Sequence, residues 1–431
     1  MERKIRVLVV TYHPWREDIS VGNTLSNIFK GMEDKLDFAN IYIRDDKAST
    51  NIASRFFNIS EKKLIRSIFT RKGVGKEILP VKPDEIKENF SRSYNKARQL
   101  RWDSLLFVQD LIGIWGKWKT PELDLFIRDY NPDIIFGPLG RMPIDNDIMT
   151  YISKQYKIPL IVYPWDDHYS LHKRSWSPIF WLKLFVERRH IRRCAEQSEY
   201  LYTITSWMQE EYKHYFGKPC KLLYKGYHFE KKPNKPLGDP LKIIYMGNIG
   251  AGRWKVLTKV VQAVNSINNK GEKLYELYIY TLSPKTPRIV KQLNIGSSQL
   301  MEPVASSALM ETLQSADILL HVEPVKGMEW VMVGLSFSAK RVGYLVNAEC
   351  ILAVGGNTAT MRYLVENDAG IVIFNENKIK DSLMKLTLER YKIVEYADKA
   401  WKCGYENHQI SSIQSALLHD FITTINDYEN R

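Results

Sequence analysis

Short apolar runs alternate with amphipathic stretches along the whole chain. In the first half, runs typical of buried strands stand at residues 6–10, 38–43, 133–137, 159–163 and 200–205. Stretches with helical periodicity follow them at residues 23–32, 144–156 and 178–196, and from Ser206 onward. Runs that are apolar throughout indicate strands covered on both faces. The pattern therefore predicts an α/β fold with doubly wound sheets.

The composition changes at residues 228–240 (HFEKKPNKPLGDP), a polar segment rich in Lys and Pro that is typical of a linker. After it the alternation resumes, with apolar runs at residues 241–246, 277–280, 317–322, 350–354 and 370–374. We therefore expect an N-terminal domain over residues 1–227, with a helical insertion at about 50–120, and a C-terminal domain over residues 241–408. Residues 409–431 are predicted to form a final helix that packs back on the first domain.

Composition narrows the class of protein. A chain of 431 residues with 44% hydrophobic and 26% charged residues is long enough for two globular domains. No apolar segment is long enough to span a bilayer, and the start, MERKIRVLVV, lacks the features of a signal peptide. The four cysteines have no metal-ligand spacing and are expected to be reduced thiols. These features predict a cytoplasmic protein.

The net charge of +13 is compatible with a polyanionic ligand, an anionic membrane surface or a basic host proteome. No zinc-finger, RNP-type or recognition-helix pattern accompanies it, so nucleic acid is not an expected partner.

Residues 336–356 (SFSAKRVGYLVNAECILAVGG) carry the first candidate site. Their periodicity predicts a helix followed by a buried strand. Ser336 and Ser338 are favourable N-cap residues, and Lys340 lies in the first turn. A helix N-terminus with a Ser and a Lys is suited to an anion, most simply a phosphate or diphosphate.

The second candidate is the turn at residues 245–253 (YMGNIGAGR), where glycines separate a strand from a helix. The glycines allow the backbone to approach a ligand closely, and Arg253 adds a permanent cation. Ligands of doubly wound sheets bind beyond the carboxyl ends of the strands, so we expect Arg253 and Lys340 on two loops at one sheet edge. The spacing departs from the GxGxxG fingerprint, and the pair of cations favours a shared diphosphate.

Several phrases of the second half resemble the donor domain of bacterial GT-B glycosyltransferases of the family-four type, namely MGNIGAGR (246–253), ADILLHVE (316–323), SFSAKRVGYLVNAECILAVGG (336–356) and TMRYLVENDAG (360–370). The resemblance extends over about residues 241–374 and is only architectural over the first half. It implies two Rossmann-like domains facing a cleft, a nucleotide-diphosphate sugar as donor, and no cofactor. The residues that would hold the donor are Gly247, Asn248, Gly250, Arg253, Val304, Ser338 and Lys340.

The chain departs from this family at one pattern. Many members carry two glutamates eight positions apart, where this chain has Leu335 and Gly343. The ribose and sugar contacts of those carboxylates must come from elsewhere, and Glu323 or Glu329 are the candidates to supply them.

The first domain is expected to hold the acceptor. The segment YPWDDHYSLHKR (residues 163–174) resembles an aspartate-containing loop of related transferases. Asp166 beside His168 can take a proton from an acceptor hydroxyl, or these residues can simply cap a surface loop. His13, at the end of the first strand, is a candidate for the same role. We expect no metal, because Arg253 and Lys340 can neutralise the diphosphate and no residue cluster has ligand spacing.

Residues 176–193 (WSPIFWLKLFVERRHIRR) bear on a membrane partner, because aromatic residues alternate there with a basic run. Such a helix can lie on an anionic bilayer, which suits a lipid-linked acceptor at the inner face of the cytoplasmic membrane. Alternatively, and by a small margin preferably, the aromatic side chains belong to the core and the arginines are solvated.

The favoured hypothesis is a glycosyltransferase that moves a sugar from a nucleotide-diphosphate sugar to a saccharide or lipid-linked saccharide in cell-surface polysaccharide assembly. The resemblance implies retention of the anomeric configuration. The alternatives are a nucleotide-sugar epimerase of the same architecture and a catalytically lapsed GT-B binding protein.

Overall fold

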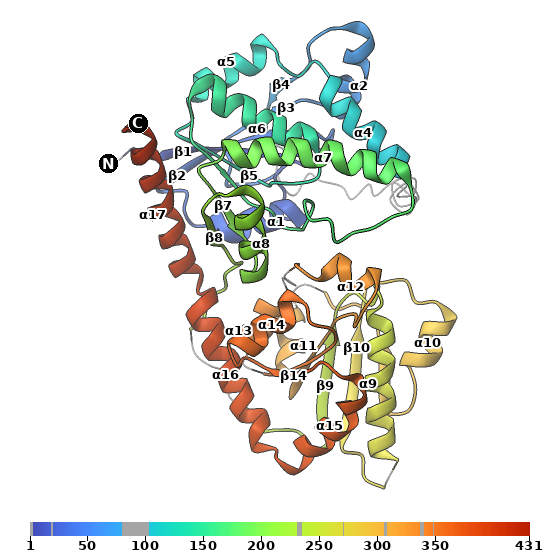
Figure 1. Ribbon diagram of the computed structural model, residues 1–431. Helices are drawn as coiled ribbons and strands as arrows, with labels where there is room; N and C mark the ends of the chain where they lie inside the picture. The colour runs from blue at the N-terminus through green and yellow to red at the C-terminus, as the bar shows by residue number, and fades with distance from the viewer. Residues whose placement is uncertain are drawn as a thin grey trace. The chain divides into compact units, whose positions relative to one another are not determined.

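The computed structural model describes residues 3–18, 20–79, 103–230, 235–269, 271–305, 308–336, 340–347 and 349–431. The chain divides into two compact units. The first consists of Met1–Leu223 together with Ile413–Arg431, and the second of Tyr224–Ser412. Each unit has a sheet of its own with helices on both faces (Figure 1).

The strands of the first unit are β1 (Ile5–Thr11), β2 (Leu36–Tyr42), β3 (Arg55–Asn58), β4 (Lys76–Ile78), β5 (Ile134–Gly137), β6 (Leu160–Val162), β7 (Tyr200–Thr203) and β8 (Cys220–Leu222). They form one sheet in the order β4-β3-β2-β1-β5-β6-β7-β8. All neighbours are parallel except β4, which pairs antiparallel with β3. The carboxyl ends of β1, β5 and β6 therefore lie side by side at one edge of the sheet.

The helices of this unit are α1 (Ser20–Phe29), α2 (Glu61–Thr70), α4 (Asp103–Trp115), α5 (Pro121–Tyr130), α6 (Pro143–Tyr156), α7 (Pro178–Gln197), α8 (Ser206–Phe216) and most of α17 (Ile410–Glu429). Leu417 and Phe421 of α17 are buried in the same core as Phe29 and Phe136. Asp420 of α17 also accepts a hydrogen bond from Tyr202 Oη at 2.6 Å. The end of the chain is thus an integral part of the first unit.

The second unit contains β9 (Leu241–Met246), β10 (Tyr275–Tyr280), β11 (Ser298–Met301), β12 (Ile318–Val322), β13 (Cys350–Val354) and β14 (Ile371–Ile373). They form a parallel sheet in the order β11-β10-β9-β12-β13-β14. Its helices are α9 (Arg253–Asn268), α10 (Pro287–Leu293), α11 (Leu309–Gln314), α12 (Met328–Val333), α13 (Lys340–Val346), α14 (Ala359–Glu366), the 3-10 turn η3 (Glu376–Lys378), α15 (Ile379–Leu388) and α16 (Tyr391–His408).

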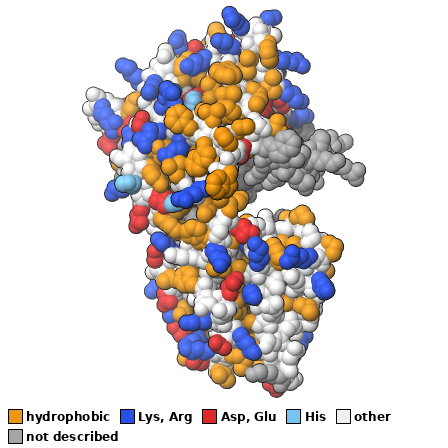
Figure 2. All heavy atoms as spheres, turned by 45° about the vertical axis from the view of Figure 1, so that its right-hand side comes forward, with side chains coloured by type: hydrophobic (Ala, Val, Ile, Leu, Met, Phe, Trp, Pro, Cys, Tyr) orange, Lys and Arg blue, Asp and Glu red, His pale blue; other side chains and the backbone are white. Residues whose placement is uncertain are grey.

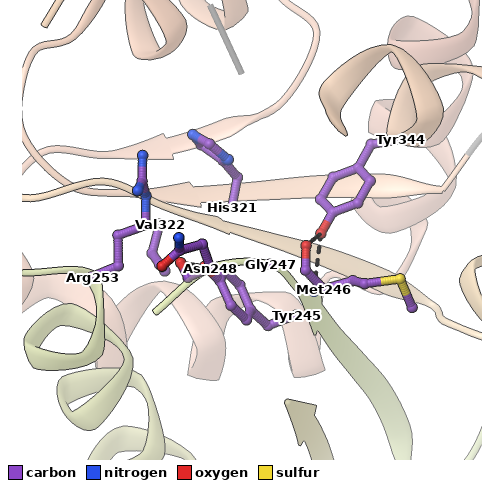
Figure 3. A pocket seen from close by; sticks show the side chains of 8 residues that line it. All are labelled: Tyr245, Met246, Gly247, Asn248, Arg253, His321, Val322 and Tyr344. Atoms are coloured by element: carbon purple, nitrogen blue, oxygen red, sulfur yellow. Dashed lines mark hydrogen bonds between the residues drawn. The ribbon is translucent and has the colours of Figure 1, made fainter. Parts of the chain in front are cut away.

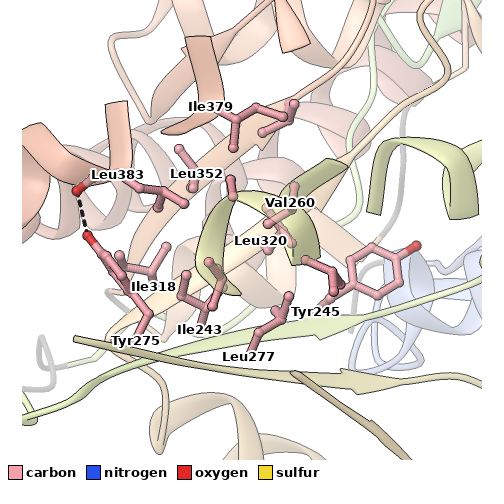
Figure 4. Packing of buried hydrophobic residues seen from close by; sticks show 14 of the residues in the cluster. Ile243, Tyr245, Val260, Tyr275, Leu277, Ile318, Leu320, Leu352, Ile379 and Leu383 are labelled. Carbon is pink, nitrogen blue, oxygen red and sulfur yellow. Dashed lines mark hydrogen bonds between the residues drawn. The ribbon is translucent and has the colours of Figure 1, made fainter. Parts of the chain in front are cut away.

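Successive residues of the central strands serve two different cores, which explains their uninterrupted apolar runs. Ile318 and Leu320 of β12 pack in a cluster with Val260 of α9 and Leu383 of α15 (Figure 4). Leu319 packs on the other face, in the cluster that contains residues of α13, α14 and α16. Because side chains alternate between the faces of a strand, a sheet covered twice requires apolar residues at every position.

The structure differs from the sequence-based expectations at β3, β4, β8 and β11. Within the predicted helical insertion, β3 and β4 extend the main sheet, and Phe56 and Phe57 of β3 are both buried. Residues 80–102 of that insertion lie outside the described residues. The strand β11 was not predicted, because only its first residue is fully buried and its sequence, SQLM, has little apolar character.

Candidate functional site

The turn between β9 and α9 is held in shape by its own side chains. Tyr245 Oη donates a hydrogen bond to the carbonyl of Asn248 at 2.6 Å. The Asn248 side-chain oxygen accepts from the Gly250 amide at 2.6 Å and from Ser283 Oγ at 3.0 Å. Gly252, the N-cap of α9, has a φ of 76°, a conformation that suits glycine. The loop is therefore tight, and Arg253 is the first residue of the helix.

Arg253 is oriented by a buried carboxylate. Its Nη2 lies 3.0 Å from Oε2 of Glu323, whose side chain is only 2% exposed. His321 Nε2 lies 3.1 Å from the other carboxylate oxygen of Glu323. Burial of an ionised carboxylate is costly unless a cation accompanies it, so Glu323 and Arg253 hold each other in place. The guanidinium keeps some exposure and can meet a ligand.

A cavity of about 130 Å³ opens beside this turn, at the carboxyl ends of β9 and β12 (Figure 3). It is lined by Tyr245, Met246, Gly247, Asn248, Arg253, His321, Val322 and Tyr344. Tyr344 enters from α13, and its Oη accepts a hydrogen bond from the Met246 amide at 3.2 Å. Burial raises the pKa of Tyr344 to about 12, so its hydroxyl keeps its proton at neutral pH.

Five of the predicted donor residues lie at this cavity or next to it. Gly247, Asn248 and Arg253 line the cavity, Gly250 lies in the same loop, and Glu323 contacts Arg253. In the structure Glu323 positions Arg253, and the ribose or sugar contact that the sequence suggested for Glu323 stays a prediction.

The remaining donor predictions lie away from the cavity lining or outside the description. Val304 follows β11, which is separated from β9 by β10, and it does not line this cavity. Lys340 begins α13, one turn before Tyr344, but its side chain is not among the described ones. Ser338 lies outside the described residues.

Residues 335 and 343, where many members of the resembled family carry glutamate, are both buried in the second unit. Leu335 is buried, as its apolar character demands. Gly343 also lies inside the unit, yet among the described residues a Cβ atom there would meet only Tyr227 Oη, at 3.9 Å. Packing at position 343 therefore leaves room for the first atom of a side chain.

Several sequence-predicted acceptor residues gather at the carboxyl edge of the first unit's sheet. His13 follows β1, and Asp166 and His168 follow β6, so all three lie at the same edge of the sheet, with β5 between their two strands. Burial lowers the pKa of His168 to about 4, although Asp166 opposes this effect. The imidazole is therefore neutral at pH 7 and can accept a hydrogen bond.

Asp167, which stands between the two predicted residues, has a structural role. It accepts hydrogen bonds from the amides of Tyr169 and Ser170, from Ser170 Oγ, and from Tyr212 Oη at 3.1 Å. Burial alone would raise the pKa of Asp167, but the hydrogen bonds from Ser170 and Tyr169 lower it. This carboxylate holds the loop that presents Asp166 and His168.

The structure adds ionisable groups that the sequence reading missed. Asp145, in the first turn of α6, is 3% exposed, and its Oδ1 accepts no hydrogen bond from any described residue. Burial raises the pKa of Asp145 to about 8, against the opposing charge of Arg141. Arg141 Nη1 lies 3.1 Å from both Asp110 Oδ1 and Glu187 Oε1. Burial, opposed by Arg141, also raises the pKa of Asp110 to about 7.

Only weak sequence signals pointed to these groups. His321 is the one polar residue inside the apolar run 318–322, which is a detectable anomaly. Arg141 stands shortly after a strand and a glycine, as Arg253 does, but without the flanking family phrase. The burial of Asp145 and Asp110 depends on α4 and α7, which pack beside α6, and no local pattern encodes that.

None of the described helices combines the length and the apolar character that crossing a bilayer requires. No group of three or more His, Cys, Asp or Glu side chains among the described residues is arranged to hold a metal ion.

Neither a protein-family model nor a curated protein matches the chain. Solved structures, however, do match the chain. Anabaena HepE in complex with UDP is 10% identical, with a TM-score of 0.62, over 98% of this chain and 100% of HepE. Sucrose-phosphate synthase of Thermosynechococcus elongatus has the same identity, TM-score and coverage. A putative UDP-N-acetylglucosamine 2-epimerase of Listeria monocytogenes is 13% identical, with a TM-score of 0.53, over 98% of each chain. These likenesses confirm the predicted GT-B fold of two Rossmann-like domains.

Proposed function

We propose that this chain is a glycosyltransferase that takes a sugar from a nucleotide-diphosphate sugar and adds it to a saccharide or lipid-linked saccharide. Cell-surface polysaccharide assembly at the inner face of the cytoplasmic membrane is the process that suits such an acceptor. The observation that carries the proposal is Arg253, held by the buried Glu323 at a glycine loop that lines a cavity. Two solved structures of one protein of similar fold support it, because HepE was solved with UDP and with UDP-glucose.

The proposed chemistry relies on fixed positive charge at the leaving group. When the sugar departs, negative charge develops on the diphosphate, and a preorganised guanidinium stabilises it at no cost of reorganisation. Arg253 would supply this charge together with the amide groups at the start of α9. Lys340 is proposed as the second cation on sequence grounds. With both cations present, the reaction is proposed to need no metal.

The acceptor is proposed to bind at the first unit. The neutral imidazole of His168 would accept the hydrogen bond of the incoming hydroxyl, and Asp166 and His13 would line the same approach. An alternative acceptor for the proton of that hydroxyl, in a reaction that retains configuration, is the departing diphosphate. We propose retention on the family resemblance alone.

A screen of nucleotide sugars tests the proposal. Nucleoside diphosphates and their sugars would be added singly to the purified chain, and thermal unfolding would be recorded. A ligand at about 100 times its Kd stabilises the folded state by about 2.7 kcal/mol, which is a measurable shift. Lys259→Ala is the matched control for Arg253→Ala, because Lys259 is an exposed cation further along the same α9 helix. Failure of every nucleotide to bind would contradict the proposed donor site.

An epimerase remains the second candidate, because the Listeria protein shares the fold and because the first unit carries carboxyl groups that titrate near neutrality. Incubation of the best-binding nucleotide sugar without any acceptor separates the two. An epimerase converts the donor sugar by itself, whereas a transferase leaves it unchanged or slowly hydrolyses it. Binding without conversion under any acceptor would indicate a catalytically lapsed scaffold.

A further inference from the structure

Three helices of the first unit place large apolar side chains in solvent. Phe69 of α2 is 83% exposed, Trp115 of α4 is 59% exposed and Phe185 of α7 is 66% exposed. Trp176, just before α7, is fully exposed. The other exposed members of this set are Ile65, Leu105, Val108, Ile179, Trp181 and Leu182. Isolated apolar residues on a surface need no explanation, but a cluster of this size does.

These side chains belong to one continuous region, which we call the α2–α4–α7 face. Helix α4 packs against α7, and α2 packs against α4, so the three helices are neighbours. Figure 2 shows the hydrophobic side chains gathered over this part of the first unit, with Lys and Arg side chains around them. This finding corrects the preferred sequence interpretation, in which the aromatic residues of residues 176–193 belong to the core.

The buried face of α7 explains why the aromatic residues point outward. Lys183, Glu187 and His190 are buried there. Glu187 Oε1 lies 3.1 Å from Arg141 Nη1 and 3.5 Å from Lys183 Nζ, and His190 Nδ1 lies 2.6 Å from Asp147 Oδ1. The inner face of this helix thus holds paired polar side chains beside buried Leu184 and Ile191, and most of its aromatic residues lie on the outer side.

Charge accompanies the apolar surface. Along the exposed side of α7, Trp181, Leu182 and Phe185 come first, and Arg189 and Arg193 follow within the next two turns. Residues 61–72 hold five Lys or Arg against one Glu, and residues 171–193 hold six Lys or Arg besides the buried pair Lys183 and Glu187. Aromatic rings beside cationic side chains match the interface of a bilayer with anionic head groups.

We propose that the α2–α4–α7 face binds the surface of an anionic phospholipid bilayer. The aromatic rings would enter the head-group region, and the arginines and lysines around them would contact lipid phosphates. Binding to a second copy of the chain is less well matched, because two such basic surfaces would repel each other. The proposal concerns where the chain works, and it does not depend on the proposed chemistry of either sheet edge.

Sedimentation with lipid vesicles tests the proposal on the full chain. Vesicles of phosphatidylcholine alone would be compared with vesicles containing roughly a third phosphatidylglycerol, at low and physiological salt. The wild type should sediment with the anionic vesicles and remain in solution with the neutral ones. Each basic residue near an anionic surface strengthens binding about fivefold, so Arg189→Glu with Arg193→Glu should weaken it about 25-fold or more. Trp176→Ser with Phe185→Ser should weaken it about tenfold or more.

Matched controls change the same residue types elsewhere. Leu125→Ser with Leu388→Ser removes two exposed apolar side chains, and Lys154→Glu with Lys259→Glu reverses two exposed charges. Both controls should sediment as the wild type does. The four α7-region side chains are exposed, so thermal unfolding should show that their variants fold. The proposal is overturned if the wild type ignores anionic vesicles, if the surface variants bind as well as the controls, or if light scattering shows that the apolar variant only abolishes a dimer. Retained nucleotide binding in every variant would show that the donor site is unaffected.

Discussion

The carboxyl edges of the two sheets are built from different kinds of charge. In the second unit, one guanidinium, Arg253, is fixed by one buried carboxylate, Glu323, beside a cavity. In the first unit, Asp110, Asp145 and Glu187 are all buried near two cations, Arg141 and Lys183. The second unit therefore offers a balanced pair, whereas the first holds more carboxyl groups than charge to compensate them.

This difference is reflected in protonation. Arg253 cannot lose its proton in a protein, so its charge is permanent and suits the permanent charge of a diphosphate. Burial raises the pKa of Asp110 to about 7 and that of Asp145 to about 8, which brings both groups into the range where they gain or lose protons. A sheet edge that handles protons needs groups of this kind. The two sheet edges thus differ in their balance of buried charges, in keeping with the two tasks proposed for them.

The strongest test removes the permanent charge. Arg253→Ala should weaken binding of nucleoside diphosphates at least about 100-fold, because two charge-assisted hydrogen bonds would be lost. It should also destabilise the second unit by about 3 kcal/mol, because Glu323 would remain buried without its cation. Calorimetric titration measures the first effect and urea unfolding the second.

A double variant distinguishes binding from folding. Arg253→Ala combined with Glu323→Gln removes both charges, so stability should return while affinity stays low. Recovery of affinity in the double variant, or wild-type affinity in the single one, would show that Arg253 does not hold the diphosphate.

The next test addresses the protonated carboxyl of the first unit. Between about pH 4 and 8 the folded chain holds the Asp145 proton, whereas the unfolded chain, with a pKa near about 3.9, has released it. The stability that this group contributes therefore falls by about 1.4 kcal/mol per pH unit as the pH rises through this window. Asp145→Asn should flatten the dependence and make the chain more stable than the wild type at pH 8.

Urea unfolding at a series of pH values measures this effect. Asp427→Asn, a change at an exposed carboxylate on α17, is the control and should leave the slope unchanged. Parallel curves for the wild type and Asp145→Asn would mean that Asp145 is ionised in the folded chain.

The smallest expected effect concerns the wall of the cavity. Tyr344→Phe removes the hydroxyl that accepts from the Met246 amide and ties α13 to the end of β9. We expect a loss of about 1 kcal/mol in stability and about fivefold in nucleotide affinity, with no change in pH dependence below pH 10. Tyr391→Phe, at an exposed tyrosine of α16, provides the comparison. Equal affinity in both variants would limit Tyr344 to a packing role.

Much of the fold was predictable because its signals are local. Both sheets were expected from apolar runs, and strands such as β9, β12 and β13 occur where those runs predicted them. The glycine turn and Arg253 were also predictable, since residues adjacent in sequence form that turn. Less was predictable around residues 50–120, where buried aromatic residues of β3 lie within a basic segment that suggested helices.

The candidate site was predictable only in part, because only some of its residues are neighbours in the sequence. Gly247, Asn248 and Arg253 line the cavity as neighbours in sequence, but Tyr344 and His321 reach it from other elements. Conversely, Val304 was predicted from its position in the sequence to hold the donor, but it does not line this cavity.

The sequence by itself determined the alternation of strands and helices, the apolar layers on both faces of each sheet, and a cation at the start of α9. These are properties of short segments, in which spacing dictates which face a side chain takes. The tertiary structure decided the rest, namely which carboxyl groups are buried together at Arg141 and which aromatic rings of α7 remain in solvent. A pKa and an exposed fraction depend on neighbours distant in the sequence, and only the packing of α4, α6 and α7 brings those neighbours together.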